Sequence, residues 1–375
     1  MILEAVVGLV IVLLVLLEAF ETIILPRRVT RYFRVTRFYY IYSWRPWCAL
    51  ARRLKGAKAR ETFLGYYGPL SLLLLFVLWA ASLIVAFGLL YYSASRSDGY
   101  HTSLNTCIYM SGTSFFTLGI GDVVPHTGIE RVLTVTESGL GFGFLALVLS
   151  YLPVIYQAFS HREVNIVLLD ARAGSPPTAG ELLRRHTGPG GREALQKLLQ
   201  DWERWSAELL ESHVSYPVVA YFRSQHSNES WLAALTAILD ATALLISGLD
   251  DECSRQARLT FAMCRHTVVD LAQVFSAAPR VLGHDRLLPQ DLDRLRASLA
   301  AAGMPLRATP EANAKLAKLR SMYEPYVFTL GGYLFMQVPP WIVSEEVSEN
   351  WKTSAWGRIS GLAISAPPSP GVDDH

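Results

Sequence analysis

Three long apolar runs, separated by polar stretches, dominate the first part of the chain. They lie at residues 2–25, 69–92 and 129–159, and each is long enough for a helix that crosses a membrane, which takes about 20 residues. The first run lacks a basic start and a small-x-small cleavage site, so it is predicted to be a retained helix and not a signal peptide. The pattern predicts an all-α membrane protein with three transmembrane helices.

The stretch between the second and third runs predicts a loop that dips into the membrane. Residues 100–116 are long enough for a helix that crosses half of the membrane, and its carboxyl end arrives at residues 117–122, which read T-L-G-I-G-D. Gly119 and Gly121 tolerate φ > 0, so an alternating backbone can aim successive carbonyl oxygens at one axis. Four such loops around that axis would replace the water shell of a potassium ion. The alternative is an ordinary glycine turn, which the apolar flanks disfavour.

The carboxyl-terminal half has the periodicity of helices and no alternating strand pattern. Thr178 and Glu181 have the spacing of a capping box, and Thr309 followed by Pro310 is a typical helix start. The segment 231–249 is apolar enough for a fourth span, but we interpret it as a buried bundle helix. The helices are predicted at 179–187, 191–212, 217–226, 229–249, 252–276, 286–302 and 310–336.

Charge sets the predicted orientation. The chain has 51% hydrophobic residues and a mean hydropathy of +0.26, which indicates a membrane part joined to a soluble part. Residues 26–60 hold eleven basic residues and no acidic one, and such loops stay in the cytoplasm. We therefore expect the amino terminus outside, the 93–128 loop on the external side of the cell membrane, and everything after residue 159 in the cytosol.

The basic stretch also alternates with aromatic residues. On a helical wheel Arg27, Arg31 and Arg34 share one face, as expected for a helix that lies among lipid headgroups. Trp44 and Trp47 continue this interfacial character. The predicted partner is anionic lipid rather than nucleic acid, although these arginines could serve orientation alone.

The T-L-G-I-G-D segment resembles the selectivity filter of the potassium channel family, T-V-G-Y-G-D. Thr117, Gly119, Gly121 and Asp122 match. The resemblance covers residues 69–159 and implies a bacterial two-helix pore with a single pore loop, here with an additional amino-terminal helix. A single loop implies a homotetramer. The resemblance implies that K⁺ is bound by the backbone carbonyls of Thr117, Leu118, Gly119 and Ile120.

Several positions depart from the family pattern. Leu118 and Ile120 replace valine and tyrosine, and Phe116 stands where the family most often has threonine. The family places an acidic residue in the pore helix at the position of Thr113. Because the filter tyrosine braces the loop in the family, these departures put strict selectivity in more doubt than conduction.

The third apolar run holds three candidates for gating. Gly141 lies at the distance from the filter at which the family often has a hinge glycine, although close helix packing is the alternative reason for a glycine there. Pro153 removes a backbone hydrogen bond and is expected to kink the helix. Glu137 is an ionisable residue inside the membrane, facing either the pore-helix hydroxyls or a water-filled cavity. Glu18 and Glu21, in the first run, are predicted to pair with arginines.

The favoured function is a tetrameric potassium-selective channel that is gated at the inner helix and regulated by the cytosolic helices, whose ligand or partner the sequence does not identify. The alternatives are a weakly selective cation channel, or a membrane sensor or scaffold with a vestigial pore. No nucleophile, metal cluster or cofactor motif indicates an enzyme, and the four cysteines indicate no disulfide framework. The predicted parts are a first transmembrane helix 1–26, a basic aromatic segment 27–62, a pore domain 63–159, a linker 160–178, a helical domain 179–350 and a tail 351–375.

Overall fold

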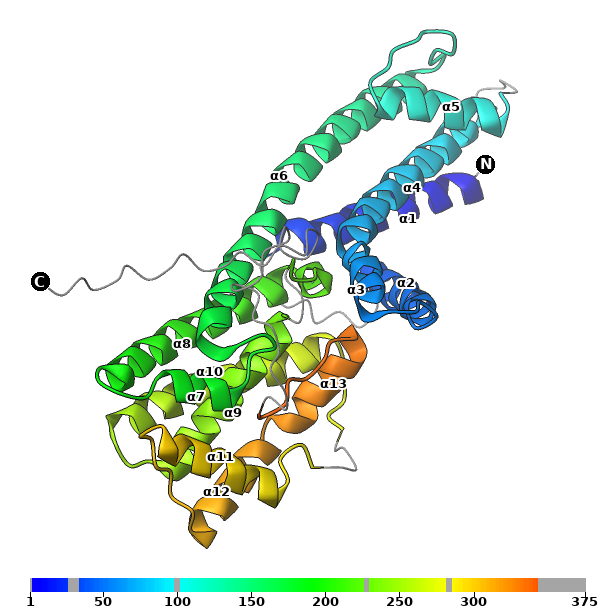
Figure 1. The fold of residues 1–375 in the computed structure, drawn as a ribbon. Coiled ribbons are helices and arrows are strands. Elements are labelled where there is room, and N and C mark those ends of the chain that lie inside the picture. The colour runs from blue at the N-terminus through cyan, green and yellow to red at the C-terminus, as the bar shows by residue number, and fades with distance from the viewer. Residues whose placement is uncertain (1, 26–33, 98–101, 226–228, 281–284, 343–375) are drawn as a thin grey trace, which may run out of the picture. The chain divides into compact units, whose positions relative to one another are not determined.

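The protein is helical throughout the part of the chain that the structure describes. Helices make up the regular elements there, and no strand occurs among these residues (Figure 1). This confirms the predicted fold class, an all-α membrane protein with a helical carboxyl-terminal region. The computed structural model describes residues 2–25, 34–97, 102–225, 229–280 and 285–342.

The chain divides into two compact units, which are described separately. The membrane unit consists of Met1–Arg162 together with Glu208–Arg223, and the helical unit consists of Glu163–Ala207 together with Ser224–His375. This division differs from the predicted one, because a short segment from the middle of the carboxyl-terminal half packs with the membrane helices.

Among the described residues, four helical segments are long and apolar enough to cross a membrane, and three of them begin in the membrane unit, at Ile2, Ala57 and Gly128. They account for the three predicted spans. The elements that lie in or begin in this unit are α1 (Ile2–Ala19) with its π-helical end η1 (Phe20–Ile24), α2 (Val35–Ala51), α3 (Ala57–Gly65), α4 (Tyr67–Ser97), α5 (Leu104–Phe115), α6 (Gly128–Ala173) and the short 3₁₀ helix η2 (Pro217–Tyr221).

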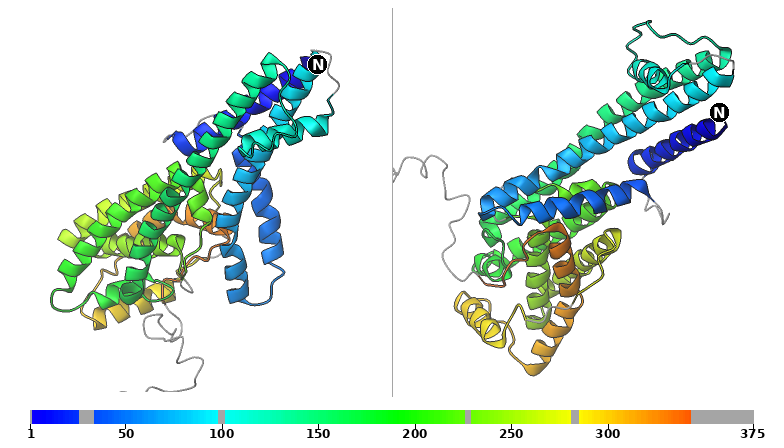
Figure 2. Two further views of the ribbon diagram at one scale, coloured as in Figure 1. Left: turned by 90° about the horizontal axis from the view of Figure 1, so that it is seen from above. Right: turned by 90° about the vertical axis from the view of Figure 1, so that its right-hand side faces the viewer.

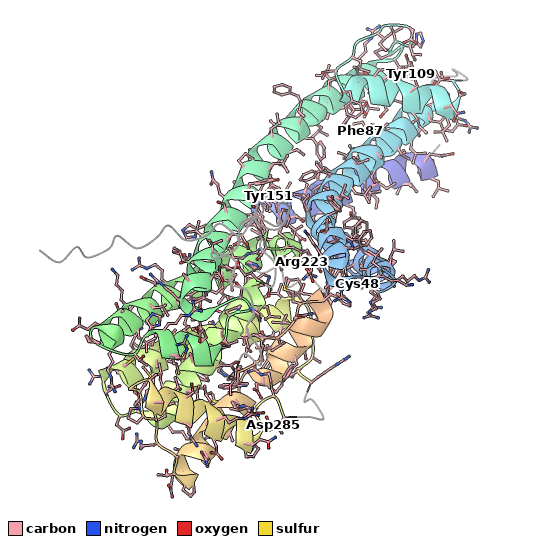
Figure 3. The ribbon with its side chains drawn as sticks, in the orientation of Figure 1. Cys48, Phe87, Tyr109, Tyr151, Arg223 and Asp285 are labelled. Atoms are coloured by element: carbon pink, nitrogen blue, oxygen red, sulfur yellow. The ribbon has the colours of Figure 1, made fainter. Side chains whose placement is uncertain are left out.

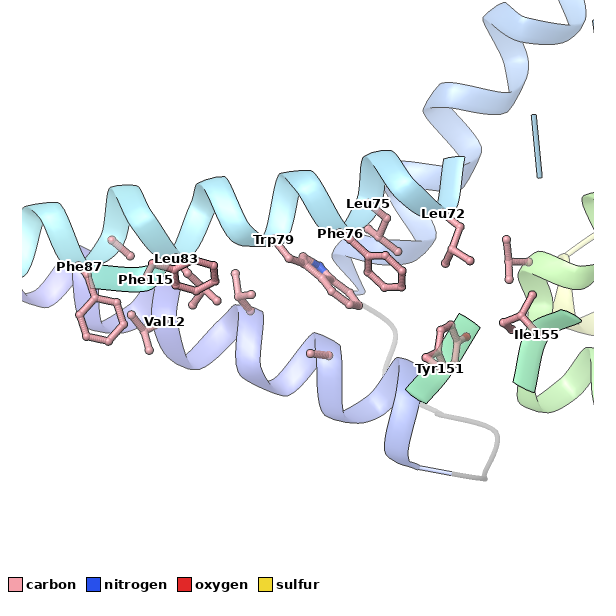
Figure 4. Close-up of a cluster of buried hydrophobic side chains, with 14 of the residues drawn as sticks. Val12, Leu72, Leu75, Phe76, Trp79, Leu83, Phe87, Phe115, Tyr151 and Ile155 are labelled. Carbon is pink, nitrogen blue, oxygen red and sulfur yellow. The ribbon is translucent and has the colours of Figure 1, made fainter. Parts of the chain in front are cut away.

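The core of the membrane unit lies along α4. Helix α1 runs beside α4 (Figure 2), and Val12 packs there with Trp79, Leu83 and Phe87 (Figure 4). Phe115, at the end of α5, joins the same cluster. The pore-loop helix is therefore anchored in the apolar core formed by the first two spans.

Two acidic residues near the inner end of the first span act differently. Glu21 lies 3.7 Å from Arg34, as predicted for an ion pair. Glu18 accepts hydrogen bonds from the backbone N–H groups of Val35 and Thr36, at 3.1 and 3.0 Å, and so caps α2. Both carboxylates tie the end of the first span to the start of α2.

Of the three arginines predicted to share a lipid-facing helical face, the structure describes only Arg34. Arg34 is extended and precedes α2, and it pairs with Glu21, while Arg27 and Arg31 lie outside the described residues. Trp44, predicted to be interfacial, is only 3% exposed, because it packs on the rings of Tyr67 and Tyr221. Aromatic pairs of this kind contribute about 0.5–1.5 kcal/mol beyond the burial of their area.

Trp47 likewise stacks on Phe63 of α3, with ring centroids 4.5 Å apart. Helices α2 and α3 thus form a hairpin held together by rings. Trp44 and Trp47 therefore contribute to this packing, whereas Tyr42 of the same helix is 69% exposed.

The predicted linker at 160–178 is also wrong over most of its length. Helix α6 continues for 46 residues through Pro153 to Ala173, since no helix-ending residue occurs before Gly174, which takes the left-handed conformation with φ of 81°. The inner helix and the first part of the predicted linker are therefore one continuous element.

The helical unit is a bundle around α9. Each residue of α9 is buried, as the interpretation of a bundle helix requires, although α9 is also the fourth segment apolar enough for a span. The predicted helix at 217–226 is only the short η2, and the predicted helix at 310–336 divides into two before Pro325. The helices are α7 (Ala179–Arg185), α8 (Gly191–Ser215), α9 (Trp231–Gly248), α10 (Glu252–Val274), α11 (Pro289–Ala301), α12 (Pro310–Ser321) and α13 (Glu324–Leu334).

The charged residue of α9 has partners inside the bundle. Asp240 is fully buried, accepts a hydrogen bond of 2.5 Å from the Tyr323 hydroxyl and forms an ion pair with Arg286. A buried carboxylate is tolerated only when it is paired in this way. The pair explains how an otherwise apolar helix carries an acid at its centre.

His213, near the end of α8, makes the membrane unit sensitive to acid. It is fully buried, with its Nε2 3.4 Å from a guanidinium nitrogen of Arg162. Burial, and then the charge of Arg162, lower the pKa of His213 well below its usual value of 6.5. The unfolded chain binds a proton near that pH and the folded chain does not. Stability is therefore complete above about pH 6.5 and falls below it by up to ~1.4 kcal/mol per pH unit.

Thermal unfolding midpoints between pH 8 and pH 5 measure this effect. The variant His213→Gln is expected to lose this part of the acid sensitivity, because glutamine does not titrate. Equal acid slopes in the two proteins would contradict the assignment.

Candidate functional site

The pore helix α5 begins and ends in defined caps. Ser103 accepts a hydrogen bond from the backbone N–H of Thr106 at its start. At its end, the N–H of Leu118 donates to the carbonyl of Thr113 at 2.8 Å, and the N–H of Thr117 donates to the carbonyl of Ser114 at 3.0 Å. This pair of bonds is a Schellman motif. The helix therefore stops where the T-L-G-I-G-D segment begins.

The backbone of that segment alternates. Thr117, Gly119 and Gly121 have φ values of 53°, 61° and 82°, whereas Leu118 and Ile120, between them, do not have positive φ. Left-handed residues at every second position reverse the peptide direction repeatedly. A non-glycine residue at Thr117 is costly in this conformation, but the Schellman bonds hold it there.

The side chains of the segment are uncovered within one chain. Phe116, Leu118 and Ile120 are 58%, 60% and 59% exposed, which is unusual for three large apolar residues so close together. The described residues of one chain therefore do not cover the side chains of Leu118 and Ile120.

Asp122, at the end of the segment, accepts a hydrogen bond of 3.1 Å at its Oδ1 from the backbone N–H of Val123. The side chain of Tyr109 in α5 interacts with the Asp122 carboxylate. Sequence reasoning missed Tyr109, which lies less than two turns before the end of α5.

The inner helix α6 starts in a capping box. The backbone N–H of Glu130 donates to the Thr127 hydroxyl at 3.2 Å, and the Glu130 carboxylate accepts from the N–H groups of His126 and Thr127 at 2.7 and 3.2 Å. These bonds fix the end of the connecting chain that leads from the filter segment into α6.

Glu137 of α6 is completely buried behind the pore helix. Its two carboxyl oxygens lie 2.5 Å from the Ser111 hydroxyl of α5 and 2.8 Å from the Tyr91 hydroxyl of α4. Of the two surroundings considered for this residue, the structure has the pore-helix hydroxyl. Glu137 thus connects α4, α5 and α6 at one point. The potassium channel family has an acidic residue in the pore helix, where this chain has Thr113. Here the acidic residue behind the pore helix comes from α6.

The next turn of α6 meets the end of the pore helix. The Ser138 hydroxyl donates to the carbonyl of Ser114 at 3.2 Å. A Cβ atom on Gly141 would lie 2.0 Å from the carbonyl oxygen of Phe115, so only glycine fits there. Gly139 and Gly143 have open space at the corresponding position. The geometry supports close packing at Gly141, and a hinge role for it stays a prediction.

Pro153, the third gating candidate, does not approach the filter segment. It is exposed and lies inside the uninterrupted α6, three turns beyond Gly141. Of the three candidates, the structure brings Glu137 and Gly141 together against α5 and leaves Pro153 apart.

Comparison with known proteins identifies this arrangement of outer helix, pore helix, loop and inner helix. Residues 73–157 match a family model described as an ion channel. This segment is similar to an ion channel domain. It includes most of α4, all of α5, the filter segment and the first part of α6, and it points to transport rather than catalysis. Among the described residues no cluster of three His, Cys, Asp or Glu side chains could hold a metal ion.

A longer similarity extends beyond the ion channel domain. The chain is 24% identical over 210 residues to the uncharacterized membrane protein YdjJ of Bacillus subtilis (strain 168), and the match covers 54% of this chain. It spans 59% of the relative's length. No solved structure matches. The matches support a multi-pass membrane protein that carries an ion channel domain.

Proposed function

We propose that four copies of the chain assemble around one axis into a potassium-selective channel of the cell membrane. Backbone carbonyls of residues 117–120 from each copy replace the hydration shell of K⁺, and Asp122 places a ring of carboxylates at the entrance. Helix α6 carries the gate, and the helical unit regulates it from the cytosol. The amino terminus lies outside the cell.

The observation that carries this proposal is the alternating backbone at the end of the pore helix. Left-handed conformations at Thr117, Gly119 and Gly121 are what a row of carbonyls aimed at one axis requires. The uncovered side chains of Leu118 and Ile120 support an assembly, because neighbouring copies can cover them. The carboxyl end of α5 adds the negative end of a helix dipole, which favours cations.

Reversal potentials with K⁺ on one side of a reconstituted bilayer and Na⁺ on the other test selectivity. A reversal potential displaced strongly towards the K⁺ equilibrium value is expected.

Equal permeability to K⁺ and Na⁺ would favour the second candidate, a weakly selective cation channel. That candidate draws support from Ile120, which has neither the ring nor the hydroxyl with which the family braces its filter. An assembled tetramer without any current would favour a sensor or scaffold with a vestigial pore.

Gly119→Ala is expected to abolish the current while leaving assembly intact. Gly119 has φ of 61°, a conformation that costs an alanine about 1 kcal/mol or more. The variant is therefore expected to turn its peptide and remove one ring of carbonyls. Single-channel recording and size-exclusion chromatography check both halves of the prediction.

Gly112→Ala is the matched control. Gly112 lies in the pore helix, and a Cβ atom there would meet its nearest neighbour at an ordinary 3.8 Å. This variant is expected to conduct. Current that persists in Gly119→Ala would show that ions do not pass along this backbone.

We also propose anionic lipid as a partner of the basic segment on the cytosolic side. Six described cations of the α2–α3 hairpin are exposed, and a headgroup layer of opposite charge would attract them. Binding to vesicles with and without anionic lipid measures this attraction. The exposed cations are Arg37, Arg45, Arg52, Arg53, Lys55 and Lys58.

A further inference from the structure

The segment Glu208–Arg223 lies in the membrane unit although the chain on both sides of it belongs to the helical unit. It comprises the last turns of α8 and the short η2, and it follows the ion channel domain by about 50 residues. Its side chains Val218, Val219 and Phe222 are part of the same apolar core as α4 and the inner helix. A piece of the carboxyl-terminal half is therefore built into the membrane unit.

On one side this segment is fastened to the inner helix. Arg162 of α6 is only 3% exposed, and its guanidinium donates to the backbone carbonyls of Val219 at 3.0 Å and Phe222 at 2.9 Å. The same guanidinium lies over the ring of Phe159, 5.2 Å from its centroid. Charge-assisted bonds to buried carbonyls are strong, and they leave costly unpaired groups when they break.

Contacts between aromatic rings also attach the segment to α6. Phe222 packs on Phe159 with centroids 5.6 Å apart, and Tyr216 packs edge-on against Tyr151 at 5.7 Å. Phe159, Tyr151 and Arg162 lie on α6 around and beyond Pro153, at the carboxyl end of the ion channel domain. The segment thus contacts α6 well away from the filter segment, as the position of Tyr151 in Figure 3 illustrates.

On its other side the segment is fastened to the base of the outer helix. The ring of Tyr221 stacks on Tyr40 of α2 at 5.6 Å and meets Tyr67 of α4 edge-on at 5.3 Å. A Cβ atom on Gly68 would lie 2.7 Å from the Phe222 ring, so α4 and the segment are in direct contact. Arg223 lies 3.6 Å from Glu61 of α3.

We propose that residues 216–223 are a strut that fixes the spacing between the inner helix and the base of the outer helix, and through which the helical unit acts on the gate. The inference rests on the proposed channel function. The chain leaves the helical unit after Ala207, reaches the strut through the last turns of α8, and returns to the helical unit at Ser224, so a rearrangement of that unit displaces the strut from both ends. Arg162 passes this displacement to α6 because it is bonded to the strut backbone.

The test is Arg162→Gln in the full-length chain, recorded as single channels in a bilayer. Glutamine is shorter and uncharged and cannot reach both carbonyls. The open probability is expected to change by about fivefold or more, the size of a typical coupling between sites. Unitary conductance and reversal potential are expected to stay unchanged, because the filter segment is not touched. Arg172→Gln is the matched control, an exposed arginine on the same helix, and it is expected to leave the open probability unchanged.

A distance measurement makes the test independent of current. Spin labels replace the exposed residues Tyr66, beside α4, and Tyr156, on α6, in chains diluted with unlabelled copies. The four native cysteines are buried and are left in place. The distance distribution is expected to broaden or shift in Arg162→Gln and to keep the wild-type form in Arg172→Gln.

The outcomes separate the two proposals. A wild-type protein that assembles but carries no current overturns the channel function, and the distance distributions then decide on the strut alone. A conducting protein whose open probability and label distances are the same in Arg162→Gln as in the wild type overturns the strut.

Discussion

Gly141→Ala is expected to destroy the packing between the inner helix and the pore helix. The added Cβ atom would lie 2.0 Å from the Phe115 carbonyl oxygen and 2.8 Å from its carbon. The obstacle is backbone at the capped end of α5, which cannot rotate away as a side chain could. Either α6 moves outward or the start of the filter segment is displaced. We expect a loss of about 3 kcal/mol or more, the upper range for overpacking, together with loss of current.

The two neighbouring glycines provide matched controls. Gly139→Ala and Gly143→Ala add the same methyl group to the same helix, but nothing lies within 4 Å of the added atom in the chain. Because alanine favours a helix over glycine by up to about 1 kcal/mol, these variants are expected to be as stable as the wild type or more stable. Thermal unfolding in detergent measures all three.

The comparison also separates two explanations for Gly141. If it were needed only as a flexible hinge, Gly141→Ala would keep the folded pore and change the gating. If close approach to Phe115 is the reason, the folded pore itself is lost. A Gly141→Ala protein with wild-type thermal stability would contradict the packing explanation.

Glu137→Ala is expected to loosen the pore helix from both of its neighbours. The substitution leaves the buried hydroxyls of Ser111 and Tyr91 without the carboxyl group that lies 2.5 and 2.8 Å from them. It also opens a cavity between α4, α5 and α6. Ser111 keeps its bond to the Ile84 carbonyl and Tyr91 its bond to Thr134, so the loss comes from two hydrogen bonds of about 1 kcal/mol each and from the cavity. We expect a total loss of roughly 3–5 kcal/mol and an unstable or absent current.

Glu137→Gln distinguishes the hydrogen bonds from the charge. The Ser111 hydroxyl also lies 2.7 Å from the carbonyl of Ile84, and a serine has one hydrogen to donate. A glutamine N–H can donate to Ser111 while its carbonyl accepts from Tyr91, so every group keeps a partner. The variant is expected to keep most of the stability and the current. Equal loss in Glu137→Gln and Glu137→Ala would show that the carboxylate charge is required instead.

Gly141 and Glu137 could be singled out from the sequence because each is unfavourable in an apolar helix. Three glycines in five residues and an acid inside an apolar helix are both unfavourable unless the surroundings require them, and Gly141 and Glu137 meet such surroundings at the end of α5. The helix starts at Thr178 and Thr309 were predictable for a different reason. Their side chains accept hydrogen bonds from N–H groups three residues later, a local interaction that the sequence fully specifies.

Features that depend on distant partners could not be predicted in this way. Trp44 has the character of an interfacial residue until Tyr221, far along the chain, covers it. The segment 217–226 has an apolar pattern that fits a helix as well as a strut, and no pattern reveals that Arg162 bonds to its carbonyls. The filter segment is the opposite case, because its glycines are separated by single residues and determine the backbone locally.

The place of the strut in the chain has a consequence for synthesis. Arg162 leaves the ribosome about 60 residues before Arg223, which corresponds to roughly 3–12 seconds at ordinary rates of translation. During that interval the three membrane helices and the filter segment are complete, but the guanidinium of Arg162 lacks the carbonyls of Val219 and Phe222. A nascent subunit therefore passes through a stage in which residues 1–162 have been synthesised but α6 lacks its contacts with the strut. A chain truncated before residue 208 would remain at that stage permanently.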